Sequence, residues 1–95
     1  RITTLYTAPT AYKAMLGALD GRDLSSLRTC VSAGEHLPEA TWRAWHDATG
    51  HKIVDGIGAT EMMHIFISAA GESIRPGATG KPVPGFTAVV LDEEG

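Results

Sequence analysis

The stretch LRTCVSAGEHLPEATWRAWHDATGHKIVD, residues 27–55, decides the fold. The segments at its two ends, Leu27 to Val31 and Lys52 to Asp55, each have the length and composition of a short strand, and they predict two strands. Between them, Pro38 is typical of the start of a helix and Gly50 of its end. A strand, a helix and a further strand in this order predict a parallel βαβ unit.

The same alternation extends toward the first residue of the chain. Residues 2–6 alternate apolar and threonine side chains and predict another strand. Thr7 as N-cap and Pro9 in the first turn predict a helix that ends at Gly21. The apolar faces of the two predicted helices consist of Tyr12, Met15, Leu16 and Leu19 in the first and Trp42, Trp45 and Ala48 in the second. The predicted fold class is therefore α/β, built from parallel βαβ units.

The last third of the chain follows a different pattern. Residues 65–67 predict a strand, residues 77–85 form a Gly- and Pro-rich bend, and residues 86–91 predict a final strand. This change to strands without helices divides the chain into an α/β portion, residues 1–77, and the start of a β-rich subdomain, residues 78–95. A final strand without a partner, and an opening without an initiator Met, lead us to interpret the chain as an internal fragment.

Composition narrows the classes of function. The chain has 95 residues, a net charge of −3 and no basic cluster, so we expect no nucleic-acid partner. No apolar run approaches the roughly 20 residues that span a bilayer, and no signal peptide is visible, so we expect a cytoplasmic protein without membrane contacts. The single cysteine, Cys30, is interpreted as a small buried apolar residue in a reducing compartment.

Two loops follow predicted parallel strands, at the sheet edge where ligands bind in such folds. These are residues 32–38 and residues 56–61, and both are rich in glycine and alanine. The second loop ends with Thr60 and Glu61, a hydroxyl beside a carboxylate. This pair suits phosphate and Mg²⁺ chemistry, although a Thr–Glu pair is more often a helix cap.

Three motifs resemble those of adenylate-forming enzymes of the AMP-binding superfamily. Residues 55–61, DGIGATE, resemble the motif (N/D/Q)-x-Y-G-x-T-E; residues 32–37, SAGEHL, resemble S-G-G-x-P-L; and residues 77–85, GATGKPVPG, resemble G-x-x-G-x-P-x-P-G. At Ile57 the family usually has an aromatic residue that stacks on adenine. The longer stretch DGIGATEMMHIF is similar to the benzoate- and aminobenzoate-CoA ligase subgroup. The resemblance implies that the chain forms part of the large N-terminal domain of an acyl-CoA synthetase.

This resemblance also implies an activity and its residues. Family members join a carboxylic acid to AMP and then transfer the acyl group to coenzyme A, using ATP and Mg²⁺. The nucleotide-binding residues would be Gly34, Glu35, His36, Asp55, Gly56, Ile57 and Thr60. The acyl pocket would include Ala33, Gly34, Gly58 and His64. Thr60 and Glu61 would be catalytic, with Glu61 holding Mg²⁺, and a benzoate-like acid would be the substrate.

Other interpretations stay open from the sequence. The parent protein could load a carrier protein instead of coenzyme A, or the chain could be a non-enzymatic nucleotide-binding module. His64 could equally be a packed core histidine. The family's phosphate-binding loop, ribose-binding Asp and catalytic Lys are not found in these 95 residues, so we expect the isolated chain to be inactive.

Overall fold

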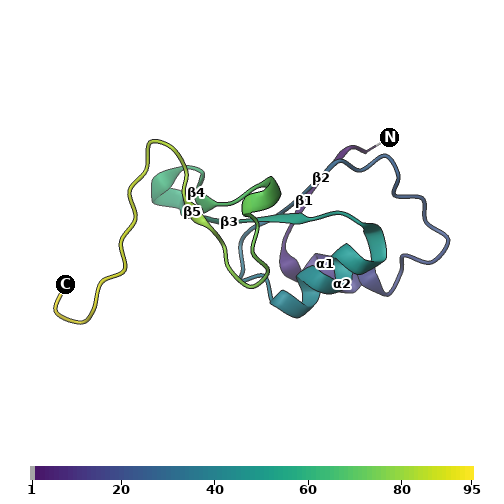
Figure 1. Ribbon diagram of the computed structural model, residues 1–95, viewed down its shortest axis with the longest axis horizontal. Helices are drawn as coiled ribbons and strands as arrows, with labels where there is room; N and C mark the ends of the chain where they lie inside the picture. Colours follow the sequence, from purple (N-terminus) through teal and green to yellow (C-terminus); the bar gives the residue numbers. More distant parts are fainter. Residues whose placement is uncertain (1) are drawn as a thin grey trace.

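The computed structural model describes residues 2–95, so Arg1, the first residue of the predicted α/β portion, lies outside them. Within that range five strands form one sheet in the order β1-β2-β3-β4-β5 (Figure 1). The elements are β1 (Thr4–Thr7), α1 (Pro9–Leu16), β2 (Thr29–Ser32), α2 (Glu39–Thr49), β3 (Ile53–Gly58), the 3₁₀ helix η1 (Thr60–Met62), β4 (Ile65–Ser68), the 3₁₀ helix η2 (Gly71–Ser73) and β5 (Lys81–Pro82). The predicted α/β class is confirmed.

The sheet has a parallel and an antiparallel half. β1, β2 and β3 are parallel neighbours, which confirms the βαβ units that the alternation predicts. β4 then pairs antiparallel with β3, and β5 pairs antiparallel with β4. The division of the chain into subdomains at residue 78 stays a prediction.

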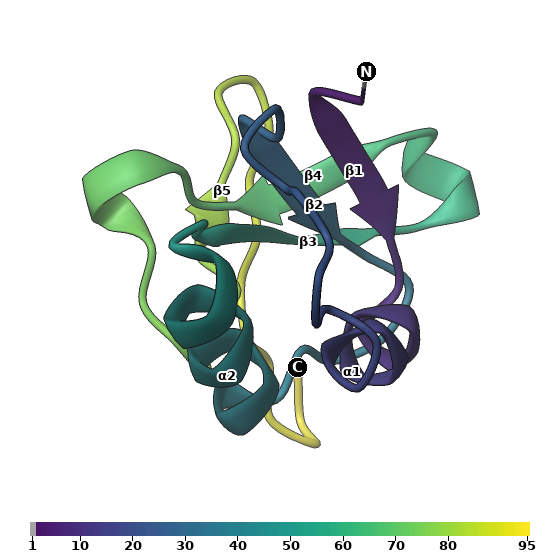
Figure 2. The same ribbon diagram turned by 90° about the vertical axis from the view of Figure 1, so that its right-hand side faces the viewer.

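The core lies between one face of the sheet and the two α-helices. α1 and α2 lie side by side on that face (Figures 1 and 2). Leu5, Cys30 and Ile53 occupy neighbouring positions on β1, β2 and β3 and pack in the same apolar cluster. Because side chains alternate between the faces of a strand, the next residues along point the other way, and Tyr6 is 60% exposed there.

Aromatic side chains fix the helices to the strands through polar contacts as well as packing. The Tyr12 hydroxyl donates to the Val31 carbonyl at 2.8 Å, and its ring meets Trp45 edge-on with centroids 4.8 Å apart. The indole Nε1–H of Trp42 donates to the Ile53 carbonyl at 2.9 Å. The predicted burial of the two tryptophans and of Cys30 is confirmed.

Three predictions about the helices are wrong. Thr7 does not cap α1, because it is the last residue of β1 and pairs with Ser32; the N-cap is Ala8. The helix ends at Leu16, well before Gly21. In α2, Pro38 and Gly50 bound the helix as predicted, but Ala48 is exposed. In the part of the chain that the structure describes, neither α-helix has the length and apolar character needed to cross a membrane.

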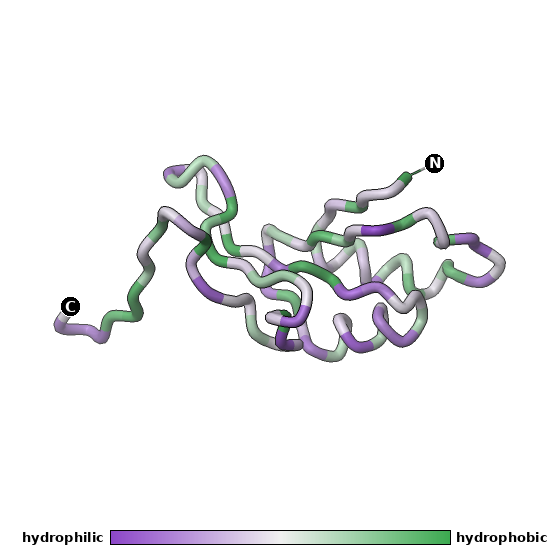
Figure 3. Tube along the Cα trace, turned by 45° about the horizontal axis from the view of Figure 1, so that its top comes forward, coloured by the Kyte–Doolittle hydropathy of each residue, from purple (hydrophilic) through white to green (hydrophobic). Residues whose placement is uncertain are grey.

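Two predictions about strands also need correction. β3 continues through Gly56 to Gly58, where a loop was predicted, because Ile57 pairs with Ile67 of β4. Residues 86–91 form no strand, since among residues 2–95 no strand lies beside them to exchange backbone hydrogen bonds. Val89, Val90 and Leu91 are exposed, and Figure 3 shows this apolar stretch near the C-terminus.

Candidate active site

The carboxyl ends of the parallel strands converge at one edge of the sheet. Thr7 of β1, Ser32 of β2 and Asp55 of β3 occupy neighbouring positions there. Residues 33–38 leave β2 at this edge and lead into α2. Beyond Asp55, the last residues of β3 lead into η1. The edge therefore collects the two segments that the sequence singles out.

A first cavity of about 300 Å³ opens at this edge. Every predicted nucleotide-binding residue except Thr60 lines this cavity. The lining residues are Gly34, Glu35, His36, Asp55, Gly56, Ile57, Gly58 and Thr79. Ile57 is 44% exposed, so its side chain offers an apolar surface to an occupant of the cavity. The structure thus places six of the seven predicted nucleotide-binding residues around one space, and Thr60 lies outside it.

A second cavity of about 700 Å³ adjoins the first, because Gly34 and Gly58 line both. All the residues predicted for the acyl pocket line this cavity, together with Thr60. Its lining residues are Tyr6, Ala33, Gly34, Gly58, Ala59, Thr60, Met63, His64 and Ile65. The two predicted sets of residues therefore occupy two spaces that share a wall.

Asp55 is the buried charge of this site, at 9% exposure. Burial raises the pKa of its carboxyl above the ordinary value, although the backbone N–H of Gly56, the Thr79 hydroxyl and the His36 ring act in the opposite direction. Its Oδ1 has no hydrogen-bond partner within the described chain. A buried acceptor at a cavity wall is suited to accept a hydrogen bond from a ligand.

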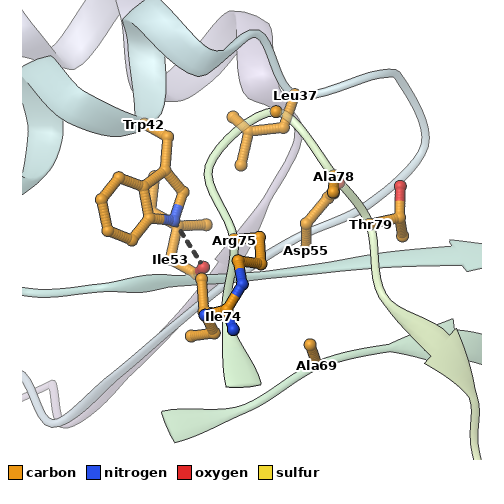
Figure 4. A pocket seen from close by; sticks show the side chains of 10 residues that line it. Leu37, Trp42, Ile53, Asp55, Ala69, Ile74, Arg75, Ala78 and Thr79 are labelled. Carbon is orange, nitrogen blue, oxygen red and sulfur yellow. Dashed lines mark hydrogen bonds between the residues drawn. The ribbon is translucent and has the colours of Figure 1, made fainter. Parts of the chain in front are cut away.

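The segment that carries Thr79 closes the site from the other side. Asp55 and Thr79 line a small cavity of about 10 Å³. Figure 4 shows both residues, together with the hydrogen bond from the Trp42 indole to the Ile53 carbonyl. The Ser68 hydroxyl of β4 donates to the Asp55 carbonyl at 2.6 Å. β4 and the segment next to β5 thus hold the end of β3 in place.

His64 and Glu61 are both exposed. The alternative of a packed core histidine is therefore wrong: His64 lies at the wall of the second cavity, with Nδ1 3.3 Å from the Ile65 carbonyl oxygen. Glu61 belongs to η1, and the residues that line the two cavities do not include it. In the described part of the chain no side chain caps η1, so the structure gives the Thr60–Glu61 pair no capping role.

The residues present fit a magnesium site of the kind completed by a substrate. No three His, Cys, Asp or Glu side chains gather as a metal site among residues 2–95. Mg²⁺, however, is commonly bound by one or two carboxylates together with phosphate oxygens and water. An exposed Glu61 next to Thr60 at the cavity rim matches that donor set.

Sequence reasoning missed Tyr6, Met63 and Thr79 as lining residues. Tyr6 could have been found, because β1 ends at the same edge as β2 and β3. Met63 follows η1 with φ 65°, an uncommon backbone conformation for a residue with a side chain. Thr79 lies 24 positions after Asp55 in the sequence, and only the packing of the intervening segment brings them together.

The family model described as AMP-binding enzyme matches residues 1–95, which is the whole chain. The chain belongs to the AMP-binding enzyme family. Benzoate–CoA ligase of Thauera aromatica is 46% identical over 92 residues, which cover 95% of this chain and 18% of that protein. The present chain therefore spans about a fifth of the length of that relative.

Solved structures agree with this assignment. The anthranilate CoA ligase AuaEII, in complex with anthranoyl-AMP, matches 98% of this chain with 55% identity and a TM-score of 0.92, and the match covers 18% of that protein. ATP-bound MatB from Rhodopseudomonas palustris matches 90% of this chain with 32% identity and a TM-score of 0.79, and the match covers 17% of that protein. These findings confirm the resemblance to the benzoate and aminobenzoate subgroup.

Proposed function

We propose that this chain is part of an ATP-dependent carboxylate–CoA ligase that acts on a benzoate-like aromatic acid. The observation that carries the proposal is the pair of adjoining cavities with Gly34 and Gly58 in their common wall. Joining an acid to a nucleotide requires both molecules to be held next to each other. Relatives whose names specify benzoate and anthranilate as acids support an aromatic substrate.

In this proposal the first cavity holds the adenine of ATP. The buried Asp55 carboxylate accepts a hydrogen bond from the exocyclic amino group, which explains a polar acceptor at this wall. Ile57 covers one face of the ring by apolar contact, and the backbone of residues 34–36 borders the other. An isoleucine gives up the stacking energy of an aromatic side chain but still removes apolar surface from water.

The second cavity holds the acid, with its carboxylate toward Thr60. Ala33 and Gly58 leave room for a flat ring, and His64 borders the ring. A carboxylate oxygen attacks the α-phosphorus of ATP, the acyl–adenylate bond forms and pyrophosphate leaves. The thiol of coenzyme A then loses its proton to solvent, its sulfur attacks the acyl carbonyl carbon, and AMP leaves with the electron pair of the broken bond.

Thr60 and Glu61 serve the first of these steps. The Thr60 hydroxyl donates a hydrogen bond to an α-phosphate oxygen, where negative charge increases during the attack. Glu61 would hold Mg²⁺, which supplies positive charge to the phosphates when it is bound. Fixed donors act best when they need no rearrangement, and Thr60 is the first residue of η1.

The test is carboxylate-dependent ATP–pyrophosphate exchange by the full-length protein, with benzoate, aminobenzoates, hydroxybenzoates and fatty acids. We expect exchange with an aromatic acid. Exchange with aliphatic acids only would retain acid adenylation and refute the proposed substrate class. No exchange with any acid would refute the proposed function.

A matched pair of variants tests the role of Glu61. Glu61→Gln should lower exchange at limiting Mg²⁺, with partial recovery at high Mg²⁺, because the amide is a weaker ligand. Glu72→Gln is the control: Glu72 is also exposed in the first turn of a 3₁₀ helix, but it lies outside both cavities. Equal effects of the two variants would contradict a metal role for Glu61.

A further inference from the structure

The loop between β2 and α2 is the segment on which both cavities depend. Ala33 lines the second cavity, Glu35 and His36 line the first, and Gly34 lines both. Gly34 has φ +95°, a conformation that side chains rarely adopt, so the loop turns sharply between the two spaces. A small displacement of this loop would change both cavities together.

Leu37 holds the end of the loop next to α2 by its burial in the core, and a polar side-chain contact holds the middle of the loop. The Thr10 hydroxyl lies 2.9 Å from each carboxylate oxygen of Glu35, to which it can donate a hydrogen bond. The backbone adds a weaker contact, from the Ala33 N–H to the Thr7 carbonyl at 3.3 Å. Thr10 and Glu35 are 25 positions apart, so the contact joins α1 to a distant part of the chain.

The contact also satisfies an electrostatic need of α1. This helix has no acidic residue in its first turn, and within the described residues no side chain caps its N-terminus. Thr10 is the second residue of α1, so the Glu35 carboxylate brings negative charge to the positive end of the helix. Both the hydroxyl and the helix therefore favour the observed position of Glu35.

We infer that Thr10 is a positioning residue, which fixes the nucleotide- and acid-binding loop through Glu35. This inference rests on the proposed function. Thr10 is not among the lining residues of either cavity, so its effect on ligands passes through the loop. The Glu35 side chain is engaged with α1, which leaves the loop backbone to face the nucleotide. Loss of the hydrogen bond between Thr10 and Glu35 weakens binding of ATP and of the acid together, because Gly34 lines both cavities.

The experiment compares three variants of the full-length protein in the exchange assay. Thr10→Val keeps the shape of the side chain and removes the hydroxyl, whereas Thr10→Ser keeps the hydroxyl. Thr29→Val is the control, because Thr29 is an exposed threonine at the opposite end of its strand from the loop. Hydrogen bonds to charged groups are stronger than neutral ones but weaken with exposure, so we expect Thr10→Val to raise KM for ATP and for the acid about three- to tenfold.

The pattern of effects separates positioning from simple destabilisation. We expect kcat to change less than KM, Thr10→Ser to stay near wild type, and amide hydrogen exchange of residues 33–37 to become faster in Thr10→Val. Combining Thr10→Val with Glu35→Ala should be no worse than Glu35→Ala alone, since both remove the same contact. A lower melting temperature with both KM values unchanged would overturn the inference, and so would strictly additive effects of the two substitutions.

If Thr10→Val does not fold, Glu35→Gln provides a second route, because it keeps an acceptor oxygen and removes the charge. It should raise both KM values by less than Glu35→Ala does; equal values for Glu35→Gln and wild type, with Glu35→Ala also unchanged, would overturn the inference. Exchange by the wild type with unaffected Thr10 and Glu35 variants refutes the positioning role alone. Absence of exchange by the wild type refutes the proposed function, and the inference falls with it.

Discussion

Gly80→Ala should be strongly destabilising and should loosen the wall of the first cavity, which Thr79 lines. Gly80 has φ +138°, and a Cβ atom there would overlap the carbonyl group of Ser68 and the next backbone nitrogen. These are atoms of the sheet backbone, which cannot rotate away. Backbone strain of about 1–3 kcal/mol adds to an overpacking cost of about 1–3 kcal/mol, so we expect a loss of about 2–6 kcal/mol. Because Thr79 adjoins Gly80 and lies beside Asp55, the KM for ATP should rise as well.

Gly85→Ala is the matched control for this substitution. Gly85 also has a positive φ, +97°, but a Cβ atom there would meet nothing within 4 Å. It should therefore cost only the backbone strain, about 1–3 kcal/mol, and leave the KM for ATP unchanged. Stability is measured by urea unfolding of the full-length variants, and binding by ATP–pyrophosphate exchange. Equal losses of stability in the two variants would refute the argument that the collision with β4 matters.

The other predictions concern three buried positions. Gly56→Ala places a Cβ 2.7 Å from Ile65 Cδ1 and 2.8 Å from its Cγ2, so it should lower the urea midpoint, and the second substitution Ile65→Ala should restore part of that loss; no restoration would contradict the packing argument. Cys30 is 1% exposed and burial raises the pKa of its thiol, so a thiol reagent at neutral pH should label it only after unfolding in urea; rapid labelling of the folded protein would contradict this. Burial raises the pKa of Asp55 above 3.8, so the folded state binds its proton more tightly than the unfolded state, and the free energy of unfolding falls as pH rises through that window. Asp55→Asn removes this pH dependence. The free energy of unfolding of the variant minus that of the wild type, measured by urea unfolding between about pH 4 and about pH 7, should therefore increase with pH. A difference that does not change with pH would contradict a buried charge at Asp55.

Local signals in the sequence predicted some elements well. α2 lies between Pro38 and Gly50 as predicted, because a proline start and a glycine stop act through the conformation of single residues. Gly50 has φ 76° and its N–H bonds to the His46 carbonyl at 2.7 Å, which satisfies the end of the helix locally. Such features require no knowledge of the rest of the chain.

Strands were harder to predict, because a strand exists only with a neighbour. Residues 86–91 have the composition of a strand but no partner among the described residues, and they are not one. Gly56 to Gly58 read as a loop and are a strand, because β4 folds back and pairs with them. In both cases the deciding fact is a long-range hydrogen-bond pattern, which composition does not contain.

The candidate site was largely accessible from the sequence, because position at the end of a parallel strand is a property of the chain order. That rule selects residues 32–38 and residues 56–61 from the sequence alone. It does not find Thr79, whose place beside Asp55 depends on the return of the chain along β4. The resemblance divides the residues into a nucleotide set and an acyl set; the first cavity is lined by the nucleotide set except Thr60, and the second by the whole acyl set together with Thr60.

Gly58 shows why pocket shape and strand packing cannot be separated here. Gly58 lines both cavities, and a Cβ atom there would lie 3.1 Å from the His64 carbonyl oxygen. A larger residue at this position would therefore push on the backbone that carries His64. Since His64 lines the second cavity, that displacement would change the wall of this cavity. Glycine at position 58 is thus favoured by the packing of β3 against the segment that leads into β4, so the width of the second cavity is partly set by how these two strands pair.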